Sequence, residues 1–258
     1  EKLKSDYFSI NQELESLKAE NKDLRKHLFQ LKDKIQRIRN YKTISINIQN
    51  GDRIKDLGTQ HFQFEKLSKY VQTKNNIFLV GSAGSGKTTA AENVAKALNI
   101  KFYFTGAINS EYKLTGFIDA QGRIVNTEFR KAYEHGGLFL FDEIDASFPQ
   151  AILAFNAALA NNYMDFPDRK VKRHKDFYCI AAANTFGTGA DRQYIGRNQL
   201  DAASLDRFIT MNWEIDERLE RELANNDEWV NYVQKARKAA SKIGERHIIS
   251  PRASMQGA

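Results

Sequence analysis

The chain has 258 residues, of which 41% are hydrophobic and 28% charged, and its formal net charge is +7. This length and composition describe a globular protein with one good core and a smaller additional unit, and they exclude an intrinsically disordered chain. No apolar run approaches the roughly 20 residues that cross a bilayer, so we expect no membrane partner. The positive charge permits contact with nucleic acid or with an acidic protein but requires neither.

The chain contains a single cysteine, Cys179. One cysteine excludes a disulfide framework and fits a reducing, cytoplasmic compartment. Cys179 lies in the apolar run 177–183, which predicts a buried and unreactive thiol. Because the sequence starts at Glu1 instead of Met and stops at Ala258 without a helix cap, we expect it to be a piece of a longer protein.

Residues 3–38 carry a heptad repeat that no Pro or Gly interrupts, which predicts a coiled coil. All core positions except Asn21 are apolar: Leu3, Tyr7, Ile10, Leu14, Leu17, Leu24, Leu28, Leu31, Ile35 and Ile38. A single core Asn is tolerated by a two-stranded parallel seam, where the two amides can pair. The cross-strand pairs Glu13–Lys18 and Glu20–Arg25 are also attractive in that register. We therefore predict a parallel dimer; the alternative is a long helix packed on its own globular domain.

The pattern changes after the heptads. Residues 43–48 alternate with period two and are followed by Asn50-Gly51, which predicts a short strand closed by a turn, and a helix is expected over 62–72. Further on, strands are predicted over 76–80, 101–105, 138–141, 177–183 and 208–213, and helices over 87–98, 127–134 and 149–161. Strands separated by crossover helices form a parallel sheet with helices on both faces. Helices over 217–225 and 227–243 would make a partial lid.

The segment from Gly81 to Thr88 matches the pattern G-x-x-x-x-G-K-[ST], follows a predicted strand and opens a predicted helix. Its glycines allow successive backbone N–H groups to point at phosphate oxygens, and the helix N-terminus adds its dipole. Lys87 would reach the β- and γ-phosphates, and the Thr88 hydroxyl would ligate Mg²⁺. The predicted nucleotide-binding residues are Gly81, Ser82, Ala83, Gly84, Ser85, Gly86, Lys87, Thr88 and Thr89.

Two adjacent carboxylates, Asp142 and Glu143, follow the apolar strand 138–141. Ligands bind at the carboxyl ends of strands in open α/β sheets, so both carboxylates should meet the phosphates there. Asp142 would hold Mg²⁺, directly or through water, and Glu143 would orient and deprotonate the attacking water.

Several stretches together resemble the AAA+ ATPases of the MoxR and dynein-related group, and within it the cobaltochelatase ATPase-subunit type with its phage-borne relatives. The resemblance covers residues 44–253, and the stretches that carry it are Thr88–Leu98, Gly136–Ala146, Ala181–Thr185, Leu200–Phe208 and Ile249–Ala253. It implies a three-layer fold around a five-stranded parallel sheet, ATP and Mg²⁺ as cofactors, and a homo-oligomer that is most often a hexamer. The chain would then divide into a coiled coil (1–40), a linker with a short strand and a helix (41–75), an AAA+ nucleotide-binding domain (76–215) and a truncated helical lid (216–258).

The resemblance also implies roles for single residues. Asn184 matches sensor 1, which helps to position the lytic water, and Arg252 matches sensor 2 on the lid. Arg207 matches the arginine finger that reaches the γ-phosphate held by the neighbouring subunit; the alternative is a salt bridge to Asp206 or Asp201. Arg197 is a second candidate for a contact in trans or in the pore.

Two insertions would face the pore of a ring. Residues 111–123 resemble the helix-2 insert of this group, or else form a plain surface hairpin. Residues 168–175 stand where the group carries a hairpin before sensor 1, and six of these eight residues are basic: Arg169, Lys170, Lys172, Arg173, His174 and Lys175. Such a cluster can contact nucleic-acid phosphates, but charge runs also serve simply as solvated faces.

Three functions follow from this sequence. The first is an ATP-hydrolysing ring motor that remodels a protein partner or complex. The second is a nucleic-acid motor or loader, favoured by the basic run and the net charge. The third, a scaffold built on the coiled coil, is disfavoured because each catalytic position carries a competent residue.

Overall fold

The computed structural model describes residues 14–18, 20–25, 27–28, 45–46 and 55–257. The chain divides into two compact units, Glu1–Thr43 and Ile44–Ala258. In the first unit every described residue is helical, as the heptads predict. Most of the heptad positions, and the pairing of two helices, lie outside the described residues, so the parallel coiled coil stays a prediction.

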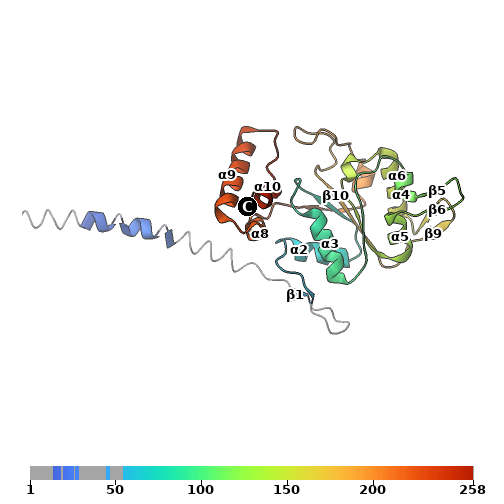
Figure 1. Cartoon of the computed structure of the whole chain (residues 1–258), viewed down its shortest axis with the longest axis horizontal. Helices are drawn as coiled ribbons and strands as arrows, with labels where there is room; N and C mark the ends of the chain where they lie inside the picture. The colour runs from blue at the N-terminus through green and yellow to red at the C-terminus, as the bar shows by residue number, and fades with distance from the viewer. Residues whose placement is uncertain (1–13, 19, 26, 29–44, 47–54, 258) are drawn as a thin grey trace, which may run out of the picture. The chain divides into compact units, whose positions relative to one another are not determined.

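The second unit is built on a parallel five-stranded sheet, as predicted (Figure 1). Its strands are β3 (Ile77–Val80), β4 (Phe102–Thr105), β7 (Gly137–Phe141), β10 (Phe177–Ala183) and β11 (Ile209–Asn212), in the order β11-β3-β10-β7-β4. Every neighbouring pair runs parallel. Because β10 lies between β3 and β7 and all three strands are parallel, their carboxyl ends meet at one edge of the sheet. The P-loop follows β3, the paired carboxylates follow β7, and Asn184 follows β10.

The alternation of side chains along each strand separates two apolar cores. On one face Leu79 and Leu140 pack with helices α2 (Phe64–Gln72) and α3 (Lys87–Leu98). On the other face Phe139 packs with helices α5 (Glu128–His135) and α6 (Pro149–Ala160). The strands are therefore buried on both faces, which explains why the sequence shows them as continuous apolar runs. Cys179 lies in the second core, where burial raises the pKa of its thiol.

Three helices follow the sheet: α8 (Glu217–Ala224), α9 (Asp227–Ile243) and α10 (Pro251–Gln256). They are joined by the buried carboxylate of Glu220, which accepts hydrogen bonds from Arg237 on α9 and from the Ser254 hydroxyl on α10. The first two helices agree with the predicted ranges to within a residue. The third was not predicted, although Ser250 at the N-cap and Pro251 at the first helical position are typical helix-start signals.

The remaining elements are short. Strand β1 (Ser45–Ile46) pairs antiparallel with β2 (Lys55–Asp56), while the predicted turn at Asn50-Gly51 lies outside the described residues. The first insertion contains α4 (Tyr112–Thr115) and the hairpin β5 (Phe117–Ile118) to β6 (Ile124–Val125). The second forms the hairpin β8 (Tyr163–Asp165) to β9 (Lys170–Lys172), and α7 (Ala202–Leu205) precedes β11. No helix in the described part of the chain is long and apolar enough to cross a membrane.

Candidate nucleotide site

The P-loop connects β3 to α3, and its backbone takes the conformation that phosphate binding requires. Gly84 and Gly86 have φ of +75° and +86°, a region that side chains rarely adopt. A Cβ on Gly84 would lie 2.9 Å from the Ser250 side chain of the lid segment, so this position also needs glycine for close approach. Since the loop ends at the first turn of α3, its N–H groups and the helix dipole converge on one place, where an anion is stabilised.

Lys87 is the buried cation of this loop, with 7% of its surface exposed. Its ammonium group donates to Gly81 O at 2.6 Å, to Ser82 O at 3.0 Å and to Asn184 Oδ1 at 2.9 Å. Burial lowers its pKa from 10.5 to about 8, although the carboxylates of Asp142 and Asp145 act in the opposite direction. The cation is therefore desolvated and held by neutral acceptors, a state that an incoming phosphate would stabilise.

Thr88 and Asp142 meet across the site, where the Thr88 hydroxyl donates to Asp142 Oδ2 at 2.6 Å. A hydroxyl and a carboxylate oxygen at this separation are hard donors of the kind that Mg²⁺ uses together with phosphate oxygens and water. Among the described residues no group of three or more His, Cys, Asp or Glu side chains could hold a metal ion by itself. The Thr88 and Asp142 oxygens would serve as protein ligands of an ion that also takes phosphate oxygens and water.

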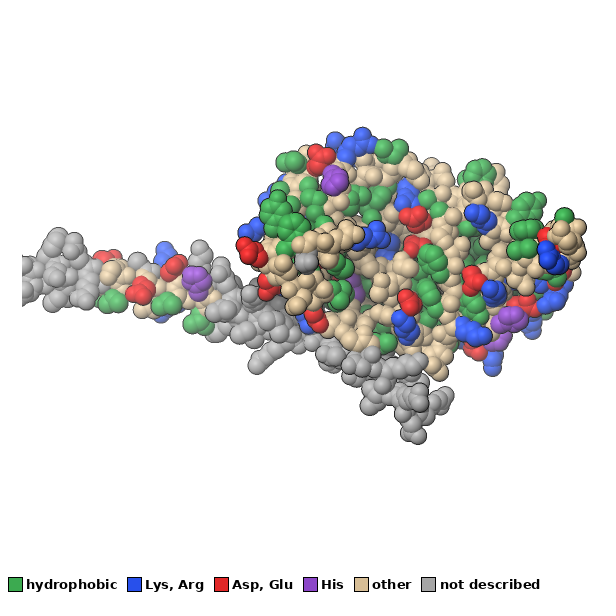
Figure 2. Space-filling view, in the orientation of Figure 1, with side chains coloured by type: hydrophobic (Ala, Val, Ile, Leu, Met, Phe, Trp, Pro, Cys, Tyr) green, Lys and Arg blue, Asp and Glu red, His purple; other side chains and the backbone are tan. Residues whose placement is uncertain are grey.

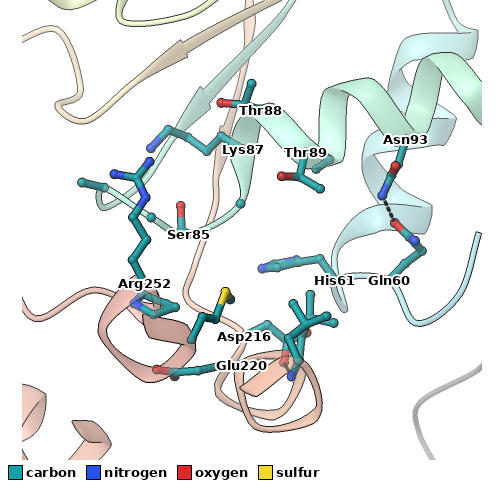
Figure 3. Close-up of a pocket in the computed structure, with 18 of the residues that line it drawn as sticks. Gln60, His61, Ser85, Lys87, Thr88, Thr89, Asn93, Asp216, Glu220 and Arg252 are labelled. Carbon is teal, nitrogen blue, oxygen red and sulfur yellow. Dashed lines mark hydrogen bonds between the residues drawn. The ribbon is translucent and has the colours of Figure 1, made fainter. Parts of the chain in front are cut away.

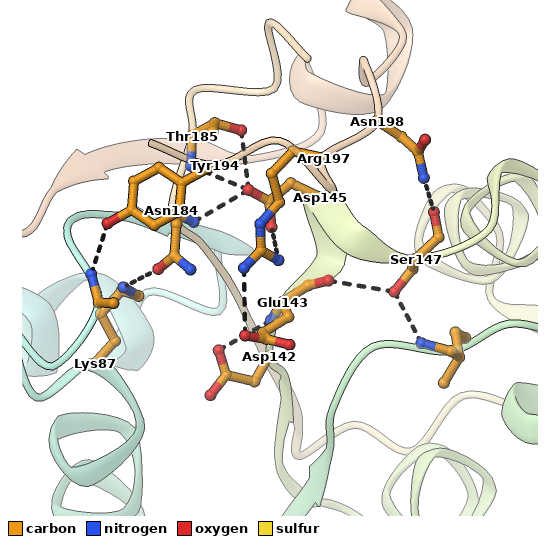
Figure 4. Close-up of polar contacts among 12 residues, drawn as sticks. Lys87, Asp142, Glu143, Asp145, Ser147, Asn184, Thr185, Tyr194, Arg197 and Asn198 are labelled. Carbon is orange, nitrogen blue, oxygen red and sulfur yellow. Dashed lines mark hydrogen bonds and ion pairs between the residues drawn. The ribbon is translucent and has the colours of Figure 1, made fainter. Parts of the chain in front are cut away.

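Glu143 and Asn184 stand beside this pair on neighbouring strand ends (Figure 4). Glu143 has φ of +53°, an uncommon left-handed conformation for a residue that is not glycine, and half of its side chain is exposed. Asn184 directly follows β10, and its side-chain oxygen accepts the hydrogen bond from Lys87. The five residues for which the sequence predicts phosphate, metal and water contacts in one subunit are therefore brought together: Lys87, Thr88, Asp142, Glu143 and Asn184.

Asp145 and Arg197 complete the cluster, and sequence reasoning missed this arrangement. The Asp145 side chain is fully buried and its Oδ2 accepts hydrogen bonds from Asn184 N, Thr185 N and Thr185 Oγ1. Arg197 Nη1 lies 3.1 Å from Asp145 Oδ1, and its Nη2 lies 3.4 Å from Glu143 Oε1. Arg197 thus contacts carboxylates of its own subunit, and its candidacy for a contact in trans or in the pore stays a prediction. The only sequence signal was the third carboxylate of Asp142-Glu-Ile-Asp145.

A cavity of about 640 Å³ extends from the P-loop to the lid. In Figure 3, His61 and Gln60 border it on one side, and Arg252 points from α10 toward the P-loop on the other. The His61 ring stacks on Trp213 with centroids 4.0 Å apart and its Nε2 contacts Glu214 O at 2.8 Å, while burial lowers its pKa. His61 thus forms an aromatic part of the cavity wall. Thr89 also lines the cavity.

Arg207 lies outside this cavity. No ion pair involves it within the described residues, so the alternative of a salt bridge to Asp201 or Asp206 does not appear. Its Nη1 donates to Ala203 O, and its Nε is a buried atom for which the described residues supply no hydrogen-bond partner. Arg207 therefore carries a charge that its own described subunit leaves uncompensated.

Three of the five Lys and Arg side chains of the basic run 168–175 contact partners within the chain. Arg169 pairs with Glu134, and Lys170 lies 3.8 Å from Asp165. Arg173 donates to Leu159 O at 3.0 Å and to Asn162. Lys172 and Lys175 are exposed. On the face shown in Figure 2, basic and acidic side chains are interspersed over the second unit.

A protein-family profile described as AAA domain (dynein-related subfamily) matches residues 76–208, just over half of the chain. The chain belongs to this family. AAA domains are ATPase modules that bind ATP together with Mg²⁺, in agreement with the P-loop and with the donor pair Thr88 and Asp142. No curated protein sequence matches the chain.

Solved structures share the fold at low sequence identity. A candidate ATPase from Cytophaga hutchinsonii is 17% identical with a TM-score of 0.50, over 76% of this chain and 56% of that one. NtrX from Brucella abortus is 17% identical with a TM-score of 0.51, over 88% and 46%. A mutant of RuvB from Thermotoga maritima is 16% identical with a TM-score of 0.48, over 74% and 58%.

These likenesses show the fold alone. In all, 821 chains match, so the fold alone does not identify one function. The chain spans about half the length of these solved structures.

Proposed function

We propose that this chain is the ATP-hydrolysing subunit of a AAA+ ring motor that uses ATP turnover to remodel a protein partner or complex. The observation that carries the proposal is the convergence of Lys87, Thr88, Asp142, Glu143 and Asn184 at one edge of the sheet. None of these positions has lost the group that hydrolysis needs. A protein that only bound nucleotide, or served as a scaffold, would not require all five.

Within one subunit the roles divide as follows. The P-loop N–H groups and Lys87 hold the phosphates, and Thr88 with Asp142 would ligate Mg²⁺, which neutralises charge on the phosphate oxygens. Glu143 would accept a proton from the attacking water, since its carboxylate is half-exposed at the mouth of the cluster. Asn184 would orient that water, and Arg252 would contact the phosphates when the lid closes.

The proposal includes an oligomer, because Arg207 stands apart from its own cavity without a carboxylate partner among the described residues. An arginine finger supplied by a neighbour stabilises charge that develops in the transition state and can contribute about 10³–10⁵-fold in rate. A closed ring with one finger per site is the arrangement that we propose, with a hexamer as its expected size.

Two variants test hydrolysis and the finger. Glu143→Gln should bind nucleotide normally and lower kcat by at least about 100-fold, because the proton acceptor is lost while the P-loop is unchanged. Arg207→Ala should do the same, with nucleotide affinity within about twofold of the parent protein. The measurements are steady-state phosphate release and the affinity for a fluorescent ADP. Near-normal turnover in Glu143→Gln would refute the hydrolytic site, and near-normal turnover in Arg207→Ala would refute the finger.

The choice of a protein partner over nucleic acid rests on the basic run, where Arg169, Lys170 and Arg173 already have partners within the chain. ATPase assays with single-stranded DNA, double-stranded DNA and RNA decide between the two. Stimulation that falls steeply with salt would favour a nucleic-acid motor instead. Absence of stimulation across all three would leave protein remodelling.

Three further parts of the proposal rest on sequence. The likeness to the cobaltochelatase ATPase subunit points to a remodelled partner of that class. The heptads of residues 3–38 would pair as parallel dimers, which a sixfold ring accommodates as a trimer of dimers. The single cysteine supports a reducing, cytoplasmic setting. Light scattering with and without residues 1–40 tests the coiled coil, and unchanged assembly on deletion would count against an oligomerising role.

A further inference from the structure

The segment 191–198, which follows β10 and Asn184 in the chain, connects the P-loop to the carboxylate side of the nucleotide site. It is fixed by Asp191, whose Oδ1 accepts hydrogen bonds from Gln193 N and Tyr194 N, each at 2.7 Å. At its other end Asn198 N donates to Asp145 O at 2.6 Å. Between these anchors the segment presents two side chains, Tyr194 and Arg197, to the site (Figure 4).

Tyr194 contacts the P-loop. Its hydroxyl oxygen accepts a hydrogen bond from Ala83 N at 3.0 Å. Ala83 N is one of the backbone N–H groups that a P-loop turns toward phosphate. A phosphate oxygen carries charge and accepts such a bond about twice as strongly as a neutral hydroxyl does, so phosphate and Tyr194 compete for the same donor.

Arg197 contacts the catalytic carboxylate. Its guanidinium is 12% exposed and lies between the fully buried Asp145 at 3.1 Å and Glu143 at 3.4 Å. The shorter, buried contact is the anchor, because a buried carboxylate that loses its cation is costly. The longer contact is to the carboxylate of Glu143, which is half-exposed and can move. The guanidinium therefore bridges Glu143, the residue assigned to water activation, and Asp145, whose other carboxylate oxygen accepts from Asn184 N.

We propose that Arg197 is a positioning residue for Glu143 that acts within its own subunit, and that Tyr194 couples this arrangement to phosphate binding at the P-loop. The inference rests on the proposed hydrolytic function and assigns to a cis arginine a role separate from the trans role of Arg207. Arg197 aims the carboxylate of Glu143, and Asp145 keeps Arg197 in place. Displacement of Tyr194 by phosphate shifts the segment that carries Arg197, so that filling the P-loop adjusts the position of Glu143.

Arg197→Lys is the informative substitution. A lysine keeps the positive charge beside Asp145, which protects the fold, but its single ammonium lacks the planar fork that reaches two carboxylates. We expect kcat to fall by about tenfold or more with nucleotide affinity within about twofold, because the lysine no longer aims Glu143 while the P-loop is unchanged. Arg197→Gln, which also loses the charge, should have lower activity than Arg197→Lys. A loss that appears in affinity and not in kcat would overturn the positioning role.

Subunit mixing then separates cis from trans. Mixtures of Arg197→Lys with Glu143→Gln should show only the summed activity of the two variants, since every site carries one defect. If Arg197 acted in trans, about a quarter of the sites in an equal mixture would combine an intact Glu143 with an intact neighbouring arginine, and activity above the sum would appear. That recovery would overturn the inference.

The matched control is Arg207→Ala mixed with Glu143→Gln, in which the finger acts in trans and recovery is expected. Recovery in both mixtures refutes cis action of Arg197 and leaves the motor intact. If activity recovers in neither mixture, the trans role of Arg207 is refuted. The positioning role of Arg197 is then decided by whether Arg197→Lys lowers kcat or nucleotide affinity. A parent protein that does not hydrolyse ATP refutes the proposed function, and the inference falls with it.

Discussion

The two walls of the nucleotide site are built in different ways. The P-loop wall is a continuous segment whose shape comes from backbone conformation, with φ of +75° and +86° at Gly84 and Gly86. The opposite wall consists of side chains from three separate segments, held by ion pairs and hydrogen bonds among Asp145, Asn184 and Arg197. The first wall is specified locally in the sequence, whereas the second exists only once the strands are in register. The two walls should therefore respond differently to substitution.

The largest effect is expected at Lys87, which lies on the P-loop wall and donates to Asn184 on the other wall. Lys87→Met should abolish measurable nucleotide binding, a loss of at least about 100-fold, because a charged donor to phosphate is removed. The same change should raise the Tm of the nucleotide-free protein by a few degrees, since burial of the cation is unfavourable there and lowers its pKa to about 8. Calorimetry and fluorescent-ADP titration measure the two effects.

Lys96→Met is the matched control, because Lys96 lies on the same helix but is half-exposed in a pair with Glu92. Its Tm and nucleotide affinity should both stay close to those of the parent protein. If Lys87→Met lowered the Tm of the nucleotide-free protein, the buried cation would stabilise the fold, and the contrast between the two walls would fail.

The P-loop wall could be predicted from the sequence, whereas most contacts of the opposite wall could not. The five strands were predicted because their two buried faces make continuous apolar runs, and α3 agreed to the residue because its start is set by the P-loop. Asp142 and Glu143 were found since they follow such a strand directly. The contacts of Asp145 were not predicted, because they depend on the pairing of β10 with β7, and no local sequence pattern indicates that pairing.

Arg197 shows the limit most clearly. Its sequence neighbourhood, Tyr194-Ile-Gly-Arg197, does not reveal which way the side chain points, and from sequence Arg197 was a second candidate for a contact in trans or in the pore. The structure has it within 3.4 Å of Glu143, 54 positions earlier in the chain. Helix α10 was missed for a different reason: its N-cap and Pro signals are present, but six residues carry too little periodicity to be read as a helix.

The next effect in size is a pH dependence that belongs to the P-loop wall. Phosphate should bind best to protonated Lys87, whose pKa in the nucleotide-free protein is about 8. Below that pH the lysine is already charged, so affinity should be constant. Above it a proton must be taken up on binding, and affinity should fall by up to about tenfold per pH unit.

The stability of the nucleotide-free fold should change with pH in the opposite direction to nucleotide affinity. The folded pKa lies below the unfolded value of 10.5, so the unfolded chain binds more protons between pH 8 and 10.5. This group therefore destabilises the nucleotide-free fold fully below pH 8, and that cost is relieved as pH rises. Titrations of ADP from pH 7 to 9.5 test the binding side, and affinity that stays level up to pH 9.5 would show that Lys87 keeps an ordinary pKa.

The smallest effect is expected at the contact between the two walls. Tyr194→Phe removes the hydroxyl that accepts from Ala83 N and leaves the ring in place. A neutral hydrogen bond contributes about 0.5–1.5 kcal/mol, so nucleotide affinity should rise roughly two- to tenfold when phosphate no longer competes with it. Tyr232→Phe, at an exposed position on α9, is the control and should leave affinity unchanged. Weaker binding in Tyr194→Phe would instead make the hydroxyl a phosphate ligand, and the two walls would then be joined by the nucleotide itself and not by the segment 191–198.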